Sequence, residues 1–226
     1  MIRTSIMPLT TSHQIIPNAA QVDEILREAR PVKLYLGDLD EDALNRGFIG
    51  LSSTKQDDRH VRCDITQHLP FPDGSVDFFQ AEDVFEHLHF ALLPDVLDDI
   101  IRTLKPGGVL RISVPDYLCD VLRNRSTLNS SGYVCFDPGG GGDRENPGHL
   151  WFPTYALMRD LLDLTKSKSC FSVEFLHYNC PNQGWILHSV DHSVAKVKRC
   201  PDFDPRVSSP KRPLSIILDI TKHHHD

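Results

Sequence analysis

The sequence lacks long apolar runs and an excess of basic residues. No stretch approaches the 18 or more consecutive apolar residues of a membrane-spanning helix, and Pro8 and several polar residues interrupt the N-terminal segment where a signal peptide has its apolar core. Lys and Arg total 24 against 31 for Asp and Glu, a formal net charge of -7. Because binding to a phosphate backbone requires a basic surface, we expect neither nucleic acid nor a membrane as a partner.

Closely spaced cysteine pairs are also missing. The chain has six scattered cysteines and no C-x-x-C pair, which argues against a zinc ribbon or a redox dithiol. This usage fits a reducing compartment, so we expect an unprocessed, cytoplasmic protein. With 226 residues, 40% hydrophobic and 24% charged, the composition is that of an ordinary globular protein. We expect a single domain over residues 1–226, with residues 1–17 as an N-terminal extension.

Hydrophobic periodicity predicts alternating helices and strands. Apolar residues recur at helical spacing in residues 18–30, 94–104 and 155–165. Short β-prone runs occupy residues 32–36, 48–51, 60–63, 76–81, 109–114, 171–178 and 215–220. Residues 126–148 are rich in Gly, Asn and Ser, with an unbroken row from Gly139 to Gly142, and are predicted to form a flexible lid or loop. The order of elements predicts an α/β fold with a mostly parallel sheet.

Polar residues follow several of the predicted strands. In such a sheet, ligands bind outside the carboxyl ends of the strands. The residues at these positions are Gly37, Asp38, Ser52, Ser53, Asp64, Ile65, Glu82, Asp83, Asp116 and Tyr117. Several carboxylates at one edge favour a ligand with hydroxyl groups and a cationic centre, and they repel a bare polyphosphate. A nucleoside cofactor without phosphates fits this pattern.

Histidines suggest a weaker, different hypothesis. His188 and His192 have the i, i+4 spacing that can place two imidazoles on one helical face, and Asp191 lies beside them. These residues could support a metal-dependent hydrolase, although a surface pair of histidines is the simpler interpretation and we expect no metal site. His223, His224 and His225 at the end of the chain are interpreted as a solvated tail or the remnant of a tag.

One long stretch resembles a known family. Residues 69–88 read LPFPDGSVDFFQAEDVFEHL and residues 93–116 read LPDVLDDIIRTLKPGGVLRISVPD. This pattern resembles the class I S-adenosylmethionine-dependent methyltransferases, in particular the short type 11-like group. HLWFPTYALMRDLL, VKRCPDFDPR and SIILDITK fit later parts of the family pattern, so the resemblance covers about residues 32–222. It implies a Rossmann-like, seven-stranded methyltransferase sandwich with a mostly parallel sheet and an antiparallel last strand.

The resemblance also implies S-adenosylmethionine as the cofactor. The backbone at Leu36 and Gly37 would approach its methionine part, because only a small residue leaves room there. Asp64 would accept a hydrogen bond from the adenine amino group, with Ile65 against the ring. The residues implied near the sulfonium and its methyl group are Ala81, Glu82 and Asp83.

The chain departs from the family pattern in two places. The first turn reads Leu-Gly-Asp-Leu from Leu36 and lacks the second glycine, and the end of the second strand has Ser52 and Ser53 in place of an acid that binds the ribose. Either serine could replace one hydrogen bond, and Asp38 or Asp40 could reach the ribose or the amino group. These departures motivate an alternative, a catalytically inactive methyltransferase-like binding module. An open pocket beside Gly37 favours the enzyme, whereas filling of that space by Leu39 favours the module.

Methyl transfer is an in-line displacement that requires positioning of the acceptor, and a base where the acceptor is a hydroxyl. His87 and His149 are the candidate bases, with Asp116 and Tyr117 as candidate orienting groups. Both candidate bases also fit structural roles: His87, with Glu86, could cap and pack its short helix, and His149 could belong to a hinge that holds the lid. The aromatic residues that could line an acceptor pocket, or belong to the core, are Trp151, Tyr155 and Trp185. We therefore predict a methyltransferase acting on a small-molecule or sugar hydroxyl.

Overall fold

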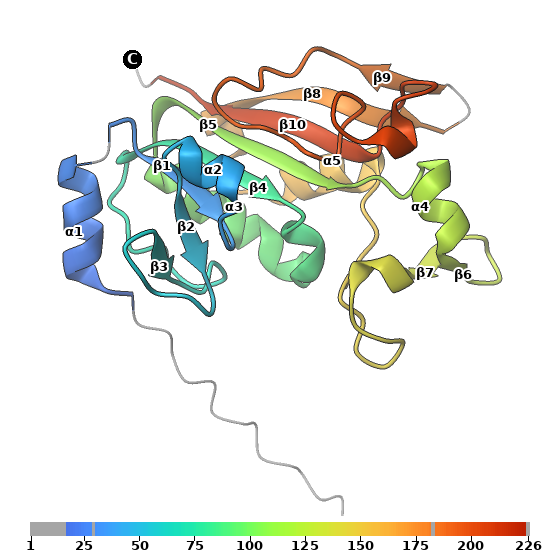
Figure 1. The fold of residues 1–226 in the computed structure, drawn as a ribbon, viewed down its shortest axis with the longest axis horizontal. Coiled ribbons are helices and arrows are strands. Elements are labelled where there is room, and N and C mark those ends of the chain that lie inside the picture. Colours follow the sequence, from blue (N-terminus) through green and yellow to red (C-terminus); the bar gives the residue numbers. More distant parts are fainter. Residues whose placement is uncertain (1–16, 29, 182–183, 225–226) are drawn as a thin grey trace, which may run out of the picture.

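A computed structural model describes residues 17–28, 30–181 and 184–224. Within these residues, eight strands form one sheet in the order β3-β2-β1-β4-β5-β10-β8-β9 (Figure 1). The strands of this sheet are β1 (Lys33–Leu36), β2 (Ile49–Ser52), β3 (His60–Arg62), β4 (Val76–Glu82), β5 (Leu104–Pro115), β8 (Phe171–Cys180), β9 (Gly184–Leu187) and β10 (Ser215–Lys222). The helices are α1 (Ala19–Glu28), α2 (Glu41–Asn45), α3 (Leu93–Thr103), α4 (Asp120–Arg125) and α5 (Tyr155–Leu164), with short 3-10 turns between them.

The sheet confirms the predicted α/β class and corrects one detail of it. Strands β3, β2, β1, β4 and β5 pair in parallel, and β10 lies antiparallel between β5 and β8. The described sheet has eight strands where seven were expected, because β9 pairs antiparallel with β8 at the edge. Gly184 and Trp185 in β9 are exposed, so this strand has no alternating buried face that the sequence pattern could reveal.

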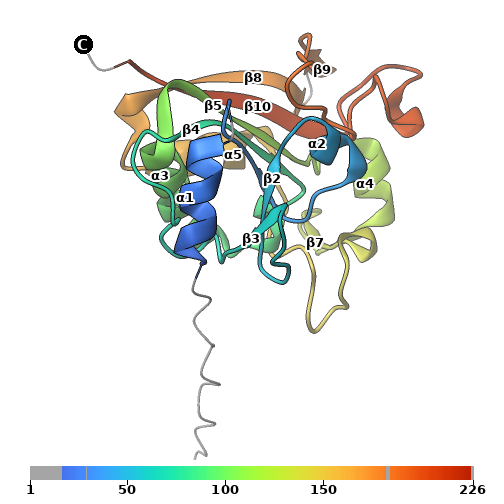
Figure 2. The same cartoon turned by 60° about the vertical axis from the view of Figure 1, so that its left-hand side comes forward.

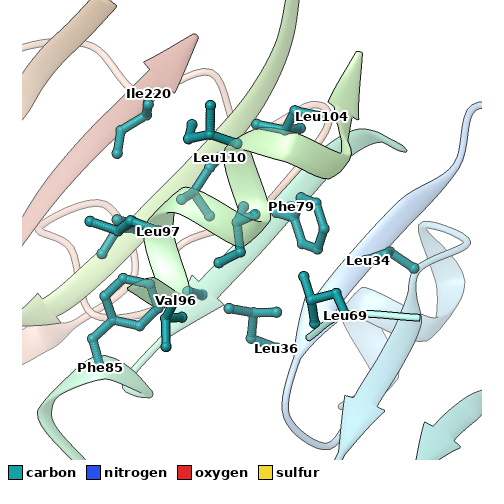
Figure 3. Packing of buried hydrophobic residues seen from close by; sticks show 14 of the residues in the cluster. Leu34, Leu36, Leu69, Phe79, Phe85, Val96, Leu97, Leu104, Leu110 and Ile220 are labelled. Atoms are coloured by element: carbon teal, nitrogen blue, oxygen red, sulfur yellow. The ribbon is translucent and has the colours of Figure 1, made fainter. Parts of the chain in front are cut away.

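The amphipathic helices α1, α3 and α5 pack on one face of the sheet. The side chain of Asn18 caps the first of them, accepting a hydrogen bond from the amide of Ala20. The 3.6-residue spacing of Val96, Leu97 and Ile100 buries one side of α3. Together with alternate residues of the central strands, these helices form the main apolar core (Figure 3).

The opposite face of the sheet is covered differently. The short helix α2 and the non-helical residues 188–200 lie there, and Tyr35, Phe48, Phe78 and Ala195 form a second apolar cluster. Figure 2 shows α1 and α2 on different sides of the first strands. Because successive residues of a strand point to opposite faces, Leu34 joins the main core and Tyr35 joins the second cluster.

Residues 126–148 contain regular structure that their composition did not predict. β6 (Thr127–Leu128) pairs with β7 (Val134–Phe136), and a 3-10 turn spans Pro138–Gly140. A Cβ on Gly139 would lie 2.5 Å from the guanidinium of Arg125, and one on Gly140 would lie 2.6 Å from the ring of His149. These two glycines therefore permit close packing, and the flexibility of the segment stays a prediction.

The predicted N-terminal extension, except for Pro17, lies outside the described residues. Among the residues that the structure does describe, no helix is long and apolar enough to cross a membrane.

Candidate functional site

A cavity of about 220 Å³ opens at the carboxyl ends of the parallel strands. Its lining comes from the ends of β1, β2, β3 and β4 and from the turn after β4: Gly37, Leu51, Ser53, Cys63, Asp64, Ile65, Asp83, Val84, His87 and Leu88. This is the edge at which ligands bind to a parallel sheet.

The altered first turn leaves this cavity open. Gly37 has a φ of 111°, a left-handed conformation that favours glycine, and a Cβ there would meet no atom within 4 Å. Leu39 packs instead against the second apolar cluster on the opposite face and does not line the cavity. The missing second glycine is therefore compatible with a ligand beside Gly37, the arrangement that favours the enzyme.

Asp64 and Ile65 form the wall that follows β3. One carboxylate oxygen of Asp64 accepts hydrogen bonds from the amide and the hydroxyl of Thr66, at 2.9 and 2.7 Å. This local turn fixes the carboxylate and leaves its second oxygen to meet a donor on a ligand. Ser53 also lines the cavity, at the end of β2.

Other predicted cofactor residues lie near the cavity without lining it. Ser52 is buried and donates a hydrogen bond to Asp38 at 2.6 Å, and Lys55 pairs with the other oxygen of Asp38 at 2.8 Å. The hydrogen bonds from Lys55 and Ser52 lower the pKa of Asp38. Leu36 and Ala81 are fully buried in the main core.

Glu82 faces away from the cavity. Its carboxylate accepts hydrogen bonds from the amides of Lys198 and Arg199, at 2.7 and 3.3 Å. Burial, followed by the charge of Asp83, raises the pKa of Glu82 to about 7. Glu82 thus anchors the segment around Arg199 rather than a ligand in this cavity.

Asp83 stands where the cavity meets a buried polar cluster. It has a φ of 55°, and Arg199 pairs with its carboxylate at 2.9 Å. Its other carboxylate oxygen is buried without a hydrogen-bond partner. The strained backbone at Asp83 therefore directs its carboxylate to the edge of the sheet just beyond the end of β4.

Glu86, His87 and His149 form the centre of this cluster. One ligand-capable atom from each lies within 4.8 Å of the other two. Both carboxylate oxygens of Glu86 are buried without a hydrogen-bond partner, and one lies 3.8 Å from Nε2 of His149. Nδ1 of His87 lies 2.8 Å from the carbonyl oxygen of Gly148, to which it donates, so its Nε2 remains available.

Tyr117 and Asp137 orient His149. The Tyr117 hydroxyl donates to a carboxylate oxygen of Asp137 at 2.6 Å, and Arg125 pairs with the same oxygen at 2.6 Å. Nδ1 of His149 lies 2.5 Å from the Tyr117 oxygen. Because the hydroxyl proton goes to Asp137, Nδ1 of His149 is the donor and Nε2 carries the lone pair.

The electrostatics of the cluster favour neutral side chains. Burial lowers the pKa of His149 to about 4, with a further contribution from the charge of His87. Burial and the neighbouring Asp83 carboxylate raise the pKa of Glu86 well above its ordinary value. His149 is thus an uncharged imidazole at neutral pH, and burial favours the protonated form of Glu86 more than it would in an exposed carboxyl group.

Asp116, predicted as a catalytic residue, is buried and uses its carboxylate to hold neighbouring segments together. One of its oxygens accepts from the amide of Leu118 and the other from the amide and side chain of Asn179. The carboxylate is fully buried and joins the end of β5 to β8. Of the two predicted orienting groups, Tyr117 contacts His149, whereas the carboxylate of Asp116 binds Leu118 and Asn179.

The hypothetical site of His188, Asp191 and His192 is not assembled in the described residues, where His192 clusters instead with Cys200 and Asp202. A carboxylate oxygen of Asp191 accepts a hydrogen bond from the amide of Ser193.

A larger, mainly apolar cavity of about 740 Å³ lies beyond the polar cluster. Tyr117, Trp151 and Tyr155 are among its lining residues, whereas Trp185 lines a different depression. The indole nitrogen of Trp151 donates to the carbonyl of Phe85 at 2.9 Å, which ties this wall to the turn that carries His87.

Sequence reasoning missed several members of the cluster. Asp137 lies within the glycine-rich segment, Arg125 ends the short helix α4, and Arg199 lies in the non-helical segment 188–200. Glu86 directly precedes His87 in the sequence. It could have been identified as an acidic residue at a position that the flanking apolar residues predict to be buried.

Comparisons with known proteins indicate a methyltransferase domain and its fold. Residues 12–112 match a family model described as a methyltransferase domain. A solved S-adenosylmethionine-dependent methyltransferase from Listeria monocytogenes is 12% identical, with a TM-score of 0.51 over 91% of this chain and 98% of that one. The YcgJ protein from Bacillus subtilis is 14% identical, with a TM-score of 0.48 over 92% and 100% of the respective chains.

No protein of curated function matches the sequence. The family model covers the first five strands of the sheet except the end of β5, and the Listeria structure extends the similarity of fold to the rest. The chain therefore resembles a methyltransferase domain over residues 12–112, and its fold is that of a solved S-adenosylmethionine-dependent methyltransferase.

Proposed function

We propose that this protein transfers the methyl group of S-adenosylmethionine to a hydroxyl of a small molecule. The observation that carries the proposal is the open cavity beside Gly37, with Asp64 and Ile65 on one wall and Asp83 on another. S-adenosylmethionine is the methyl donor of this family, and its ribose hydroxyls, amino groups and sulfonium match a cavity with carboxylates at its edge.

Asp64 accepts the adenine amino group in this proposal, and Ile65 packs against the ring. Gly37 leaves room for the methionine part, and Ser53 is the serine placed to meet the ribose. The sulfonium then lies toward Asp83, at the side of the cavity that borders His87. No acid occupies the end of β2, so cofactor affinity rests more heavily on Asp64 than it would with two acids.

The acceptor hydroxyl is proposed to lie beside His87 and His149, which we assign to its activation. Tyr117, Trp151 and Tyr155 would surround the apolar body of the acceptor in the larger cavity. That lining favours a small molecule with an apolar or aromatic body over a free sugar, which has few apolar groups to bury.

Replacing Asp64 with Ala tests the cofactor site. Isothermal titration calorimetry with S-adenosylmethionine, and separately with S-adenosylhomocysteine, should show binding to the unaltered protein and about 10- to 100-fold weaker binding to Asp64→Ala. This range follows from the roughly 1.5–3 kcal/mol of a hydrogen bond to a charged group.

Asp58→Ala is the matched control, because Asp58 is exposed and precedes the same strand. Its affinity should equal that of the unaltered protein. If neither cofactor form binds the unaltered protein at millimolar concentration, the activity proposed here is wrong and the binding module without catalysis becomes the better interpretation.

A further inference from the structure

The cluster of Glu86, His87 and His149 has the composition of a metal centre. Two imidazoles and one carboxylate are a ligand set typical of divalent first-row transition metals in proteins. The three ligand-capable atoms lie within 4.8 Å of one another and come from a 3-10 turn (Phe85–His87) and from the residue after the glycine-rich segment.

The hydrogen bonds of both histidines involve Nδ1 and leave Nε2 available to bind a metal ion. Nδ1 of His87 donates to the carbonyl of Gly148, and Nδ1 of His149 donates to the Tyr117 hydroxyl. Metal-bound histidines ordinarily donate their other ring proton to such a carbonyl or polar oxygen, which fixes the tautomer and the ring orientation. Asp137 and Arg125 continue this support behind Tyr117.

Three buried carboxylate oxygens of Glu86 and Asp83 have no hydrogen-bond donor. The side chain of Glu86 is 0% exposed and that of His149 is 4% exposed. Neither oxygen of Glu86 meets a hydrogen-bond donor, nor does one oxygen of Asp83, and the two carboxyl groups lie within hydrogen-bond reach of each other. Buried carboxylates are ordinarily paired, protonated or bound to a metal, so these atoms indicate a place for a cation.

We propose that Glu86, His87 and His149 bind a divalent transition-metal ion. Three protein ligands leave further coordination positions, as in metal sites that also bind a substrate or water. His87 lines the cofactor cavity, so the ion would lie beside the transferable methyl group and would hold the oxygen of an acceptor there. In this role the bound ion, and not a free imidazole, would activate the acceptor oxygen. The role rests on the proposed function, whereas metal binding itself does not.

Cobalt(II) is the probe, because its visible absorption reports on its ligands. Titration of the unaltered protein should show one tightly bound equivalent. Glu86→Gln has nearly the same shape but no carboxylate, and it should raise the dissociation constant at least ~100-fold. Tyr117→Phe removes the hydrogen bond that supports His149 and should raise it about 10-fold.

Three controls separate this site from other ligands. His89→Ala removes an exposed histidine two residues beyond His87 and should bind cobalt like the unaltered protein. Cys200→Ser disrupts the cluster of His192, Cys200 and Asp202 and should also leave the tight equivalent in place. The double variant His223→Ala and His224→Ala tests the terminal histidines in the same way.

Three results would overturn the metal site: no tight equivalent in the unaltered protein, equal affinity in Glu86→Gln, or loss of the equivalent in Cys200→Ser. Circular dichroism of each variant confirms that it is folded. Calorimetry with S-adenosylmethionine in the absence of metal separates the two proposals, because a failed metal site leaves cofactor binding intact.

Discussion

Glu82 shows how the environment of one residue links protonation to stability. It ends β4, where strand alternation turns its side chain away from the cofactor cavity and toward the amides of Lys198 and Arg199. Those two hydrogen bonds favour the ionised form, but burial outweighs them and raises the pKa from the ordinary 4.5 to about 7. The folded protein therefore binds a proton at pH values where the unfolded chain has released it.

We expect Glu82→Gln to change the pH dependence of stability. The contribution of this raised pKa to stability is fully present below about pH 4.5 and is lost as the pH rises through about 7. The amide has no such titration and its oxygen still accepts the backbone hydrogen bonds. Relative to the unaltered protein, Glu82→Gln should therefore become more stable between pH 5 and 8, by up to about 3 kcal/mol.

Urea unfolding at pH 5 and pH 8 measures this difference. If the difference in stability between Glu82→Gln and the unaltered protein does not grow with pH, the raised pKa of Glu82 is not its cause.

At the scale of elements, the glycine-rich segment packs closely against Arg125 and His149. Gly139 packs against the guanidinium of Arg125, and Gly140 packs against the ring of His149. Asp137, in the same segment, accepts hydrogen bonds from the Tyr117 hydroxyl and the amide of Gly139. The segment thus places the groups that orient His149, and its glycines are required where backbone and side chain approach most closely.

Substitutions at two neighbouring glycines distinguish the effect of a steric clash from the effect of backbone strain. In Gly140→Ala the added methyl would collide with the His149 ring, so we expect a destabilisation of about 1–3 kcal/mol and loss of cobalt affinity. Gly141 has a φ of 82° and open space around a Cβ, so Gly141→Ala should destabilise the fold by roughly 1–2 kcal/mol and leave cobalt affinity unchanged. Thermal unfolding and cobalt titration of both variants measure the contrast, and equal cobalt affinity in the two would refute the contact role.

At the scale of the whole molecule, the two faces of the sheet are covered by different means. Amphipathic helices bury one face, whereas residues 188–200 cover part of the other without helical structure. Arg111 of β5 binds this segment through the carbonyls of Asp191 and Ala195, at 2.5 and 2.9 Å. It also pairs with both carboxylate oxygens of Asp219 in β10.

Arg111→Met should therefore loosen this covering segment. The substitution keeps much of the side-chain volume but leaves Asp219 and two backbone carbonyls without their donor. Because the Arg111 side chain is only 6% exposed, we expect a loss of about 3–5 kcal/mol in the free energy of unfolding.

Lys166→Met is the comparison, since Lys166 forms an ion pair with Asp95 in which both side chains are largely exposed. It should produce no measurable change in urea unfolding. A similar, small effect of both substitutions would show that Arg111 does not hold the segment in place.

The sequence determined most of the elements and the edge at which the site lies. The periodicity of α1, α3 and α5 and the short apolar strands follow from which residues must be buried, and strand order placed Gly37 and Asp64 at one edge. Only the tertiary structure decided that Leu39 turns away from the cavity, that β9 adds an eighth strand, and that Glu82 faces Lys198 rather than a ligand. It also brought Tyr117, Asp137 and His149 together across long separations in the chain, because side-chain contacts between distant segments depend on packing that no local pattern encodes.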